Sequence, residues 1–160
     1  MRLLKAIQSD QRNLSATFMP AKDLYHDNVC NALTKDGWTI TDDPLVLSIG
    51  TRSVYIDLGA EKLIAAERDN QKIAVEIKSF LSPSPIRDLE NAWGQFFLYA
   101  RALKKREPDR SLYLAISLST FETIFQEEAG QLIIEEPDFR LIVFDPDHED
   151  IIQWQPQITP

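Results

Sequence analysis

The spacing of hydrophobic residues changes several times along the chain, and each change marks a predicted element. Between Met19 and Gly37 the apolar residues recur at helical spacing, which is typical of an amphipathic helix, and Gly37 is a helix-ending signal. From Trp38 onward they alternate with polar residues, as they do in strands. The pattern predicts strands at 38–41, 45–49, 53–58 and 71–80, and it fits either a strand or a helix at 61–68.

The second half of the chain begins with its longest predicted element, a helix from Pro85 to about Arg106. Ser84 is the expected N-cap, and proline is favoured at the first helical position after it. A buried strand is predicted at 112–118, and a capping box at 119–122 predicts a short helix that ends near Gly130. Two final strands are predicted at 141–144 and 151–154.

The order of these elements predicts the fold class. Consecutive strands early in the chain favour antiparallel pairing, and the long helix between Lys78 and Leu112 fits a crossover that joins two strands of one sheet. We therefore expect an α/β fold with a mixed central sheet flanked by helices. Residues 19–160 are predicted to form one domain, and residues 1–18, which lack a continuing period, are predicted to be a loosely ordered extension.

Composition narrows the class of protein. The chain has 160 residues, of which 44% are hydrophobic, enough for one domain with a substantial core. Its single cysteine, Cys30, excludes an internal disulfide, fits a reducing cytoplasmic location and is interpreted as a buried structural thiol. No apolar run approaches the roughly 20 residues of a membrane span, and the first residues lack the features of a signal peptide. The net charge of −8 argues against nonspecific coating of nucleic acid.

Two acidic residues and a lysine are predicted to meet on neighbouring strands. Strand alternation places Asp57 opposite its apolar neighbours, and it points Glu76 and Lys78 to the same side. If the two strands pair, two carboxylates and an ammonium converge, a set that suits Mg²⁺ or Mn²⁺ and a nucleophilic water. The alternative is a half-buried strand whose polar face is solvated.

The long helix offers two further candidates. Gln95 and Tyr99 are neighbours one turn apart, and a glutamine beside apolar residues needs hydrogen-bond partners when it is buried. They are predicted to face the carboxylate pair and to position water or phosphate. The alternative is an exposed polar edge.

Basic residues gather near the end of the same helix, where they are candidates for contact with nucleic-acid phosphates. The macrodipole also favours cations at a helix C-terminus, so this alternative remains open. The cluster consists of Arg101, Lys104, Lys105, Arg106 and Arg110.

The succession of Asp57, Glu76-x-Lys78 and a helix carrying Gln95 and Tyr99, in an αβββαβ order, resembles the PD-(D/E)xK nuclease superfamily. The resemblance implies a restriction-endonuclease-like core in which the acidic pair binds Mg²⁺ and the lysine assists the attacking water. Ile56 stands where the signature usually has proline. An acidic residue on the first helix often completes such sites. Asp23 and Asp27 are candidates for it here, and His26 lies between them.

A longer set of phrases resembles the XisH family of cyanobacteria, whose members are named fdxN element excision controlling factors. The phrases are AKDLYH at 21–26, DGW at 36–38, YIDLGAE at 55–61, LIAAE at 63–67, IAVEIKSF at 73–80 and GQF at 94–96. The resemblance implies a role in the excision of a DNA element during heterocyst differentiation. It also implies a small partner protein, XisI, and a separate recombinase that performs the excision.

Two functions follow, and the sequence leaves both open. In one, the chain is a Mg²⁺- or Mn²⁺-dependent nuclease that acts on DNA. In the other, it is a noncatalytic controlling factor that uses a nuclease-like scaffold to bind XisI or DNA. Assembly as a homodimer is a further open alternative. His148 lies in an acidic turn and is interpreted as a solvated surface residue.

Overall fold

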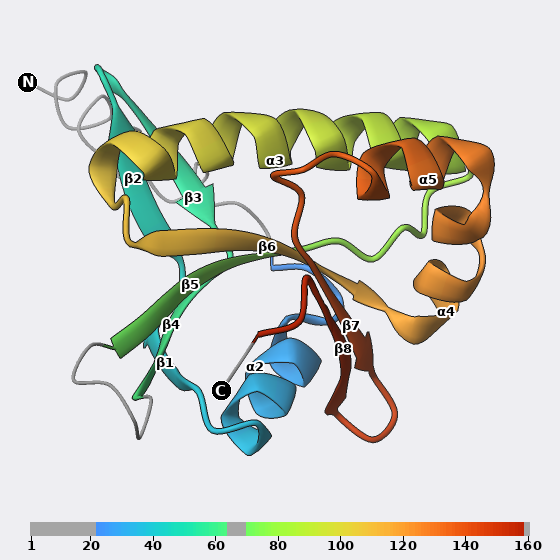
Figure 1. Cartoon of the computed structure of the whole chain (residues 1–160), viewed down its shortest axis with the longest axis horizontal. Helices are drawn as coiled ribbons and strands as arrows, with labels where there is room; N and C mark the ends of the chain where they lie inside the picture. Colours follow the sequence, from blue (N-terminus) through green and yellow to red (C-terminus); the bar gives the residue numbers. More distant parts are fainter. Residues whose placement is uncertain (1–21, 64–69, 159–160) are drawn as a thin grey trace, which may run out of the picture.

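The computed structural model describes residues 22–63 and 70–158, and in this part of the chain a six-stranded sheet lies between helices on its two faces (Figure 1). In spatial order its strands are β1 (Thr39–Asp42), β4 (Leu58–Leu63), β5 (Asn70–Ile77), β6 (Arg110–Ser117), β7 (Leu141–Asp145) and β8 (Asp150–Gln155). The pairs β1–β4, β4–β5 and β7–β8 are antiparallel, and β5–β6 and β6–β7 are parallel. The predicted mixed sheet is thus confirmed.

Two predicted segments lie partly or wholly outside the described residues. The extension predicted at 1–18 lies outside the described residues, as does most of the ambiguous segment 61–68. The described part of that segment, up to Leu63, belongs to β4 and is therefore strand.

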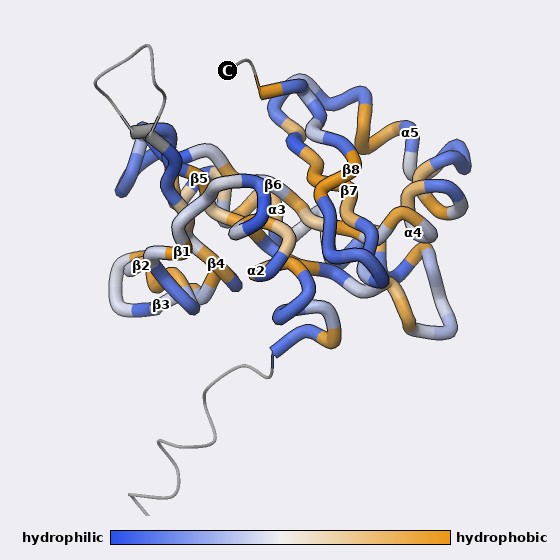
Figure 2. The backbone as a smooth tube through the Cα atoms, turned by 90° about the horizontal axis from the view of Figure 1, so that it is seen from below, coloured by the Kyte–Doolittle hydropathy of each residue, from blue (hydrophilic) through white to orange (hydrophobic). Residues whose placement is uncertain are grey.

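Each face of the sheet has its own apolar core. Helix α3 (Pro85–Arg106) packs on one face through residues such as Leu89 and Phe96, and helix α2 (His26–Lys35) packs on the other through Val29 and Leu33. Because both faces are covered, the central strands are mostly apolar, as Figure 2 shows along β7.

Local sequence signals explain where these helices begin and end. Gly37 has φ +91°, a left-handed conformation that ends α2 as predicted. The helix begins only at His26, because the Asp23 carboxylate accepts a hydrogen bond of 2.9 Å from Tyr25 N–H and the chain turns there. Helix α3 has the predicted bounds, although the Ser84 side chain makes no capping hydrogen bond.

The segment after β6 differs from its prediction. The N-cap of the next helix is Ser117, whose hydroxyl accepts a hydrogen bond from Thr120 N–H, so the capping box predicted at 119–122 is wrong. The chain forms three short helices here. Gly130 lies inside the last of them, where a Cβ would collide with the backbone of Ile124 and Phe125. They are α4 (Leu118–Glu122), η1 (Ile124–Gln126) and α5 (Glu128–Ile134).

The hairpin formed by β2 (Leu45–Ile49) and β3 (Arg52–Ile56) stands apart from the main sheet. Its two strands pair with each other in a continuous antiparallel register, for example Val46 with Tyr55. Figure 1 places it beside the C-terminal end of α3, where Arg106 Nε donates a hydrogen bond to the Ser48 carbonyl. The hairpin therefore forms part of the surface next to the end of β5.

Candidate functional site

Asp57 occupies the bend between β3 and β4, where the chain leaves the hairpin and enters the main sheet. The single strand predicted at 53–58 is therefore wrong, because β3 ends one residue before Asp57 and β4 begins one residue after it. Pairing with the strand of Glu76 starts at Leu58, which lies opposite Val75. Asp57 thus sits at a junction and not within a paired strand.

The backbone of β5 holds the Asp57 carboxylate next to the other predicted residues. The N–H of Ile77 donates a hydrogen bond of 2.7 Å to Asp57 Oδ2. Ile77 lies between Glu76 and Lys78 in the sequence, and Lys78 Nζ is 3.4 Å from Glu76 Oε1. The structure brings Asp57, Glu76 and Lys78 together around one cavity of about 300 Å³.

Glu76 is buried, which excludes the alternative of a solvated polar face. Its exposed fraction is 5%. Ile73, Val75 and Ile77 pack into the core on the α2 side, as the alternation predicts, whereas Glu76 lies near Tyr99 of α3. A charged residue is rarely buried to this extent unless it is paired or has a functional role.

The electrostatics of the two carboxylates are unfavourable to full ionisation. Burial raises the pKa of Glu76 to about 8, and the charge of Asp57 adds to the effect, while Lys78 opposes it. Burial also raises the pKa of Asp57, although the hydrogen bond from Ile77 and the charge of Lys78 favour its ionised form. Burial and the neighbouring charge of Asp57 therefore favour the protonated form of Glu76 at neutral pH.

The two predicted residues of α3 line the same cavity. Gln95 and Tyr99 are half-buried, so the alternative of an exposed polar edge does not describe them. Burial raises the pKa of Tyr99, and the charges of Glu76 and Asp57 raise it further, so its phenol stays protonated at neutral pH. Tyr99 is thus a hydrogen-bond donor toward any anion or water in the cavity.

Of the three candidates near the first helix, the structure places two at the cavity. Asp23 and His26 line the cavity, whereas Asp27 is exposed and is not among the described residues that line it. His26 Nε2 is 2.9 Å from Asp43 Oδ2, which ties the start of α2 to the turn between β1 and β2. Asp23 contributes a third acidic side chain to the cavity.

Sequence reasoning missed three polar residues of the cavity wall, which are Lys22, Asp43 and Tyr55. Asp43 falls between two predicted strands, and Tyr55 falls within a third. Their place in the site depends on how the hairpin and the β1–β2 turn fold back toward α2. No local spacing in the sequence encodes that contact.

The oxygen atoms of the cavity fit a hard divalent cation. In the described part of the chain, Glu76 Oε2 and Gln95 Oε1 are buried and have no hydrogen-bond partner. Buried polar oxygens are normally satisfied, and two of them beside a second carboxylate form the oxygen-rich set that Mg²⁺ and Mn²⁺ prefer. Asp57 and Glu76 are the residues that would hold such an ion.

Arg110 does not belong with the exposed cations. Its side chain is 6% exposed, its Nη1 donates a hydrogen bond of 2.9 Å to the Ile73 carbonyl, and its Nε lies 2.5 Å from Glu107 Oε2. Its Nη2 is within 4.0 Å of carboxylate oxygens of Glu61 and Asp42. The burial and ion pairs of Arg110 do not support its assignment to a phosphate-binding cluster.

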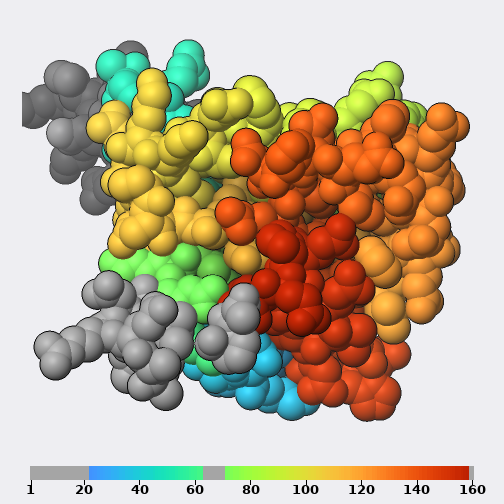
Figure 3. Space-filling view, viewed as in Figure 1, coloured from blue at the N-terminus to red at the C-terminus, as the bar shows by residue number. Residues whose placement is uncertain are grey.

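Arg101, Lys104 and Lys105 of α3 are exposed, and they project from sides of the helix away from Tyr99. Arg106, seven residues after Tyr99, lies on the same side as Tyr99 and contacts the hairpin. Lys104 follows Tyr99 by five residues, which places the two side chains about 140° apart around the helix. Arg101 and Lys104 instead line a second hollow of about 320 Å³, together with Trp93 and Phe97. The hollow lies where the C-terminal part of α3 (yellow in Figure 3) adjoins the segment after α5 (orange).

The model of one protein family, described as XisH protein, matches residues 19–152. The match includes every strand and helix named above except the last residues of β8. The chain belongs to the XisH family.

Two solved structures are similar to this chain. One, from Nostoc punctiforme PCC 73102, is an XisH family protein with 42% identity and a TM-score of 0.73, and the match covers 82% of this chain and 98% of that one. The other, from Anabaena variabilis, is named a fdxN element excision controlling factor protein; it has 46% identity and a TM-score of 0.73, with 83% and 98% coverage. Comparison with curated proteins gives no match.

Two further residues of this XisH-family chain were assigned from sequence. Cys30 is half-buried, and burial, with the charges of Asp43 and Asp27, raises the pKa of its thiol to about 11, so the thiol is protonated at physiological pH. His148 is 77% exposed and pairs with Asp145, in agreement with a solvated turn. Within the described residues, no helix has the length and apolar character needed to cross a membrane.

Proposed function

We propose that this XisH-family protein controls excision of a DNA element, and that it acts on DNA through a Mg²⁺- or Mn²⁺-dependent phosphodiester site formed by Asp57 and Glu76. The similar Anabaena protein, which is named as an excision controlling factor, supports the first part. The observation that carries the second part is the burial of Glu76 beside Asp57 in one cavity with Lys78. Gathering like charges costs stability, and such groupings are concentrated at functional sites.

The proposed scaffold is a restriction-endonuclease-like core of the PD-(D/E)xK type. Its support is the order of elements: a helix, antiparallel strands, the crossover helix α3 and a parallel strand. Asp57 immediately precedes β4, Glu76 lies in β5, and Lys78 follows the last residue of β5. The acidic pair and the lysine therefore meet where the start of β4 adjoins the end of β5.

Each residue of the cavity has a chemical task in this proposal. The bound cation would supply positive charge to a scissile phosphate and lower the pKa of a coordinated water. Lys78, held near Glu76 by a 3.4 Å ion pair, orients the attacking water or stabilises developing negative charge. Tyr99 donates a hydrogen bond to a phosphate oxygen, and the unpaired Gln95 Oε1 accepts one from water.

Calorimetric titration with Mn²⁺ tests the site. Wild-type protein is expected to bind the ion, and Glu76→Gln is expected to lose affinity by at least about tenfold, because an uncharged amide replaces a ligand. Glu90→Gln, an exposed change of the same type on α3, is the matched control and should bind as wild type does.

The pH dependence of the same titration gives a second measurement. Mn²⁺ must displace the proton from Glu76, so affinity should rise with pH and level off above about 8. The Glu76→Gln variant should lack this dependence. Wild-type affinity that stays constant between pH 6 and pH 8 would contradict the assignment of Glu76 as a ligand.

A noncatalytic function, binding of XisI or DNA, is the second candidate. The net charge of −8, together with exposed cations that lie away from the carboxylates, favours it. Replacing Arg101, Lys104 and Lys105 with alanine separates the possibilities. If these residues bind DNA, affinity should fall and the salt slope should shrink by about 0.9 for each phosphate that is no longer neutralised.

DNA binding by the triple variant is compared with that of Arg87→Ala. Arg87 is an exposed cation at the other end of α3, so this variant is the matched control. Loss of XisI binding with no change in DNA binding would identify the cluster as a protein-docking surface. Arg106 is left intact in this test because its hydrogen bond to Ser48 holds the hairpin to the helix.

A further inference from the structure

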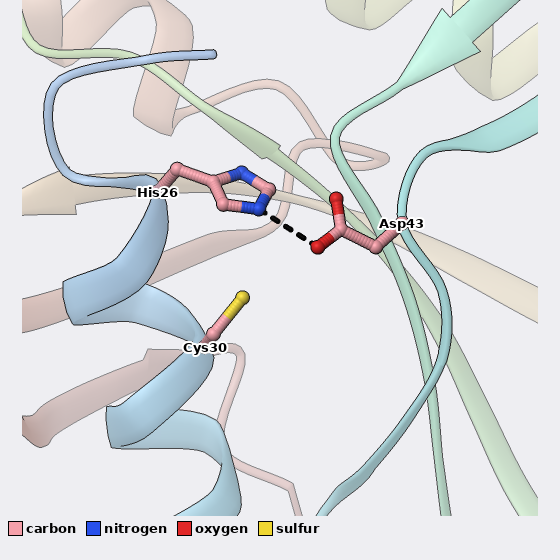
Figure 4. A group of neighbouring side chains, drawn as sticks. All are labelled: His26, Cys30 and Asp43. Carbon is pink, nitrogen blue, oxygen red and sulfur yellow. Dashed lines mark hydrogen bonds and ion pairs between the residues drawn. The ribbon is translucent and has the colours of Figure 1, made fainter.

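Three side chains of different chemistry meet beside the carboxylate cavity. Cys30 follows His26 by four residues, so both project from the same side of α2, and Asp43 approaches them from the β1–β2 turn. One ligand atom from each residue lies within 4.8 Å of the other two. Figure 4 shows the Cys30 sulfur pointing toward the space beside the His26 ring and the Asp43 carboxylate.

The burial of His26 indicates that this grouping is more than a surface ion pair. The histidine is 4% exposed, and its Nε2 lies 2.9 Å from Asp43 Oδ2. Its other ring nitrogen, Nδ1, is buried and has no hydrogen-bond partner in residues 22–63 and 70–158. Nε2 is the ring nitrogen on the side of Asp43 and Cys30, so it is the atom that would ligate a cation there (Figure 4).

We propose that His26, Cys30 and Asp43 form a binding site for a thiophilic divalent cation of the Zn²⁺ class. Nitrogen, sulfur and oxygen donors are the set that Zn²⁺ accepts, with bonds of about 2.0 to 2.3 Å. Those bonds place tetrahedral ligands about 3 to 4 Å apart, so small rotamer changes bring the three atoms to coordinating positions. The thiol proton leaves to solvent as the metal–sulfur bond forms, and a water takes the fourth position.

This site is chemically distinct from the site proposed at Asp57 and Glu76. The latter offers oxygen ligands, which suit Mg²⁺ and Mn²⁺, whereas a thiolate selects softer ions. His26 and Asp43 also line the carboxylate cavity, from α2 and from the β1–β2 turn respectively. A cation bound by both His26 and Asp43 would cross-link two walls of that cavity and fix the start of α2. The inference does not depend on the proposed nuclease activity.

Cobalt is the probe for the test, because Co²⁺ bound to a thiolate gives an ultraviolet charge-transfer band that oxygen-only sites lack. Titration of the full chain with Co²⁺ should produce this band, which should saturate at one equivalent and disappear when Zn²⁺ is added. Cys30→Ser should abolish the band. Asp43→Asn should weaken Co²⁺ binding by at least about tenfold. Glu76→Gln should leave the band unchanged, which separates this site from the proposed Mg²⁺ site.

Thermal unfolding of the metal-free proteins shows whether each variant is folded. A second readout is the melting temperature, which one equivalent of Zn²⁺ should raise in wild type and in Glu76→Gln but not in Cys30→Ser. Absence of the charge-transfer band from folded wild-type protein would overturn the proposal. A band that survives in Cys30→Ser would do the same. The three residues would then form only a hydrogen-bonded contact between α2 and the turn.

Discussion

Replacing Lys78 with alanine is expected to lower Mn²⁺-dependent DNA cleavage by at least about 100-fold, the lower bound for loss of a positioned group that acts on the reacting water. The reason is its place in the cavity: the ammonium is 3.4 Å from Glu76 Oε1 and is not itself a metal ligand. Cleavage of a labelled duplex under single-turnover conditions measures the effect.

The Mn²⁺ titration of the same variant distinguishes a role in chemistry from a role in binding. Lys78 is one of the groups that lower the pKa of Glu76, so its removal should shift metal binding to higher pH and leave affinity near the wild-type value at alkaline pH. Lys35→Ala, a change far along the chain in a surface ion pair, is the matched control. Wild-type protein that cleaves no DNA with Mg²⁺ or Mn²⁺, alone or with XisI, would favour the noncatalytic function.

Replacing Arg110 with methionine is expected to lower the free energy of unfolding by about 3 kcal/mol, near the lower end of the cost of removing one partner from a buried ion pair. The guanidinium is 6% exposed and lies among the carboxylates of Glu107, Glu61 and Asp42. Without it, these acidic groups lose the cation that they share. The expected loss of unfolding free energy is near the lower end of the range for buried ion pairs, because water still reaches these acids. Their side chains are 27% to 38% exposed.

Denaturant unfolding of Arg110→Met and of Lys105→Met provides the comparison. Lys105 is exposed on α3, so its replacement should change the free energy of unfolding by less than about 0.5 kcal/mol. If Arg110→Met has wild-type stability but binds DNA more weakly, the structural role is wrong and Arg110 belongs to the phosphate-binding cluster.

The elements with strong local signals were predicted well. Helix α3 has the predicted bounds because a proline start and an unbroken apolar stripe over 22 residues leave little ambiguity. Alternation on β5 correctly placed Ile73, Val75 and Ile77 on one face. The acidic pair was proposed from the same alternation, and the structure brings its members together, while their metal-binding role stays a prediction.

Features that depend on tertiary contacts were not predictable. Alternation continues across Asp57 although the chain changes sheets there, so the sequence pattern hides the bend. Arg110 lies close in sequence to four exposed cations, and only the neighbouring strands reveal that it is buried. The contact between His26 and Asp43 joins residues 17 positions apart in different layers, and no spacing rule connects them.

The separation of the β2–β3 hairpin from the main sheet has a consequence for how this protein can vary. The Ile77 N–H holds Asp57, and Leu58, the next residue, is in register with Val75, so the central sheet fixes the carboxylate directly. The hairpin pairs only with itself among the described strands, and its tip at Gly50 has open space around it. Insertions at that tip would therefore leave the carboxylate where it is. The tip is thus the part of the hairpin that can be lengthened, because the base of the hairpin contributes Leu45, Leu47 and Ile56 to the core.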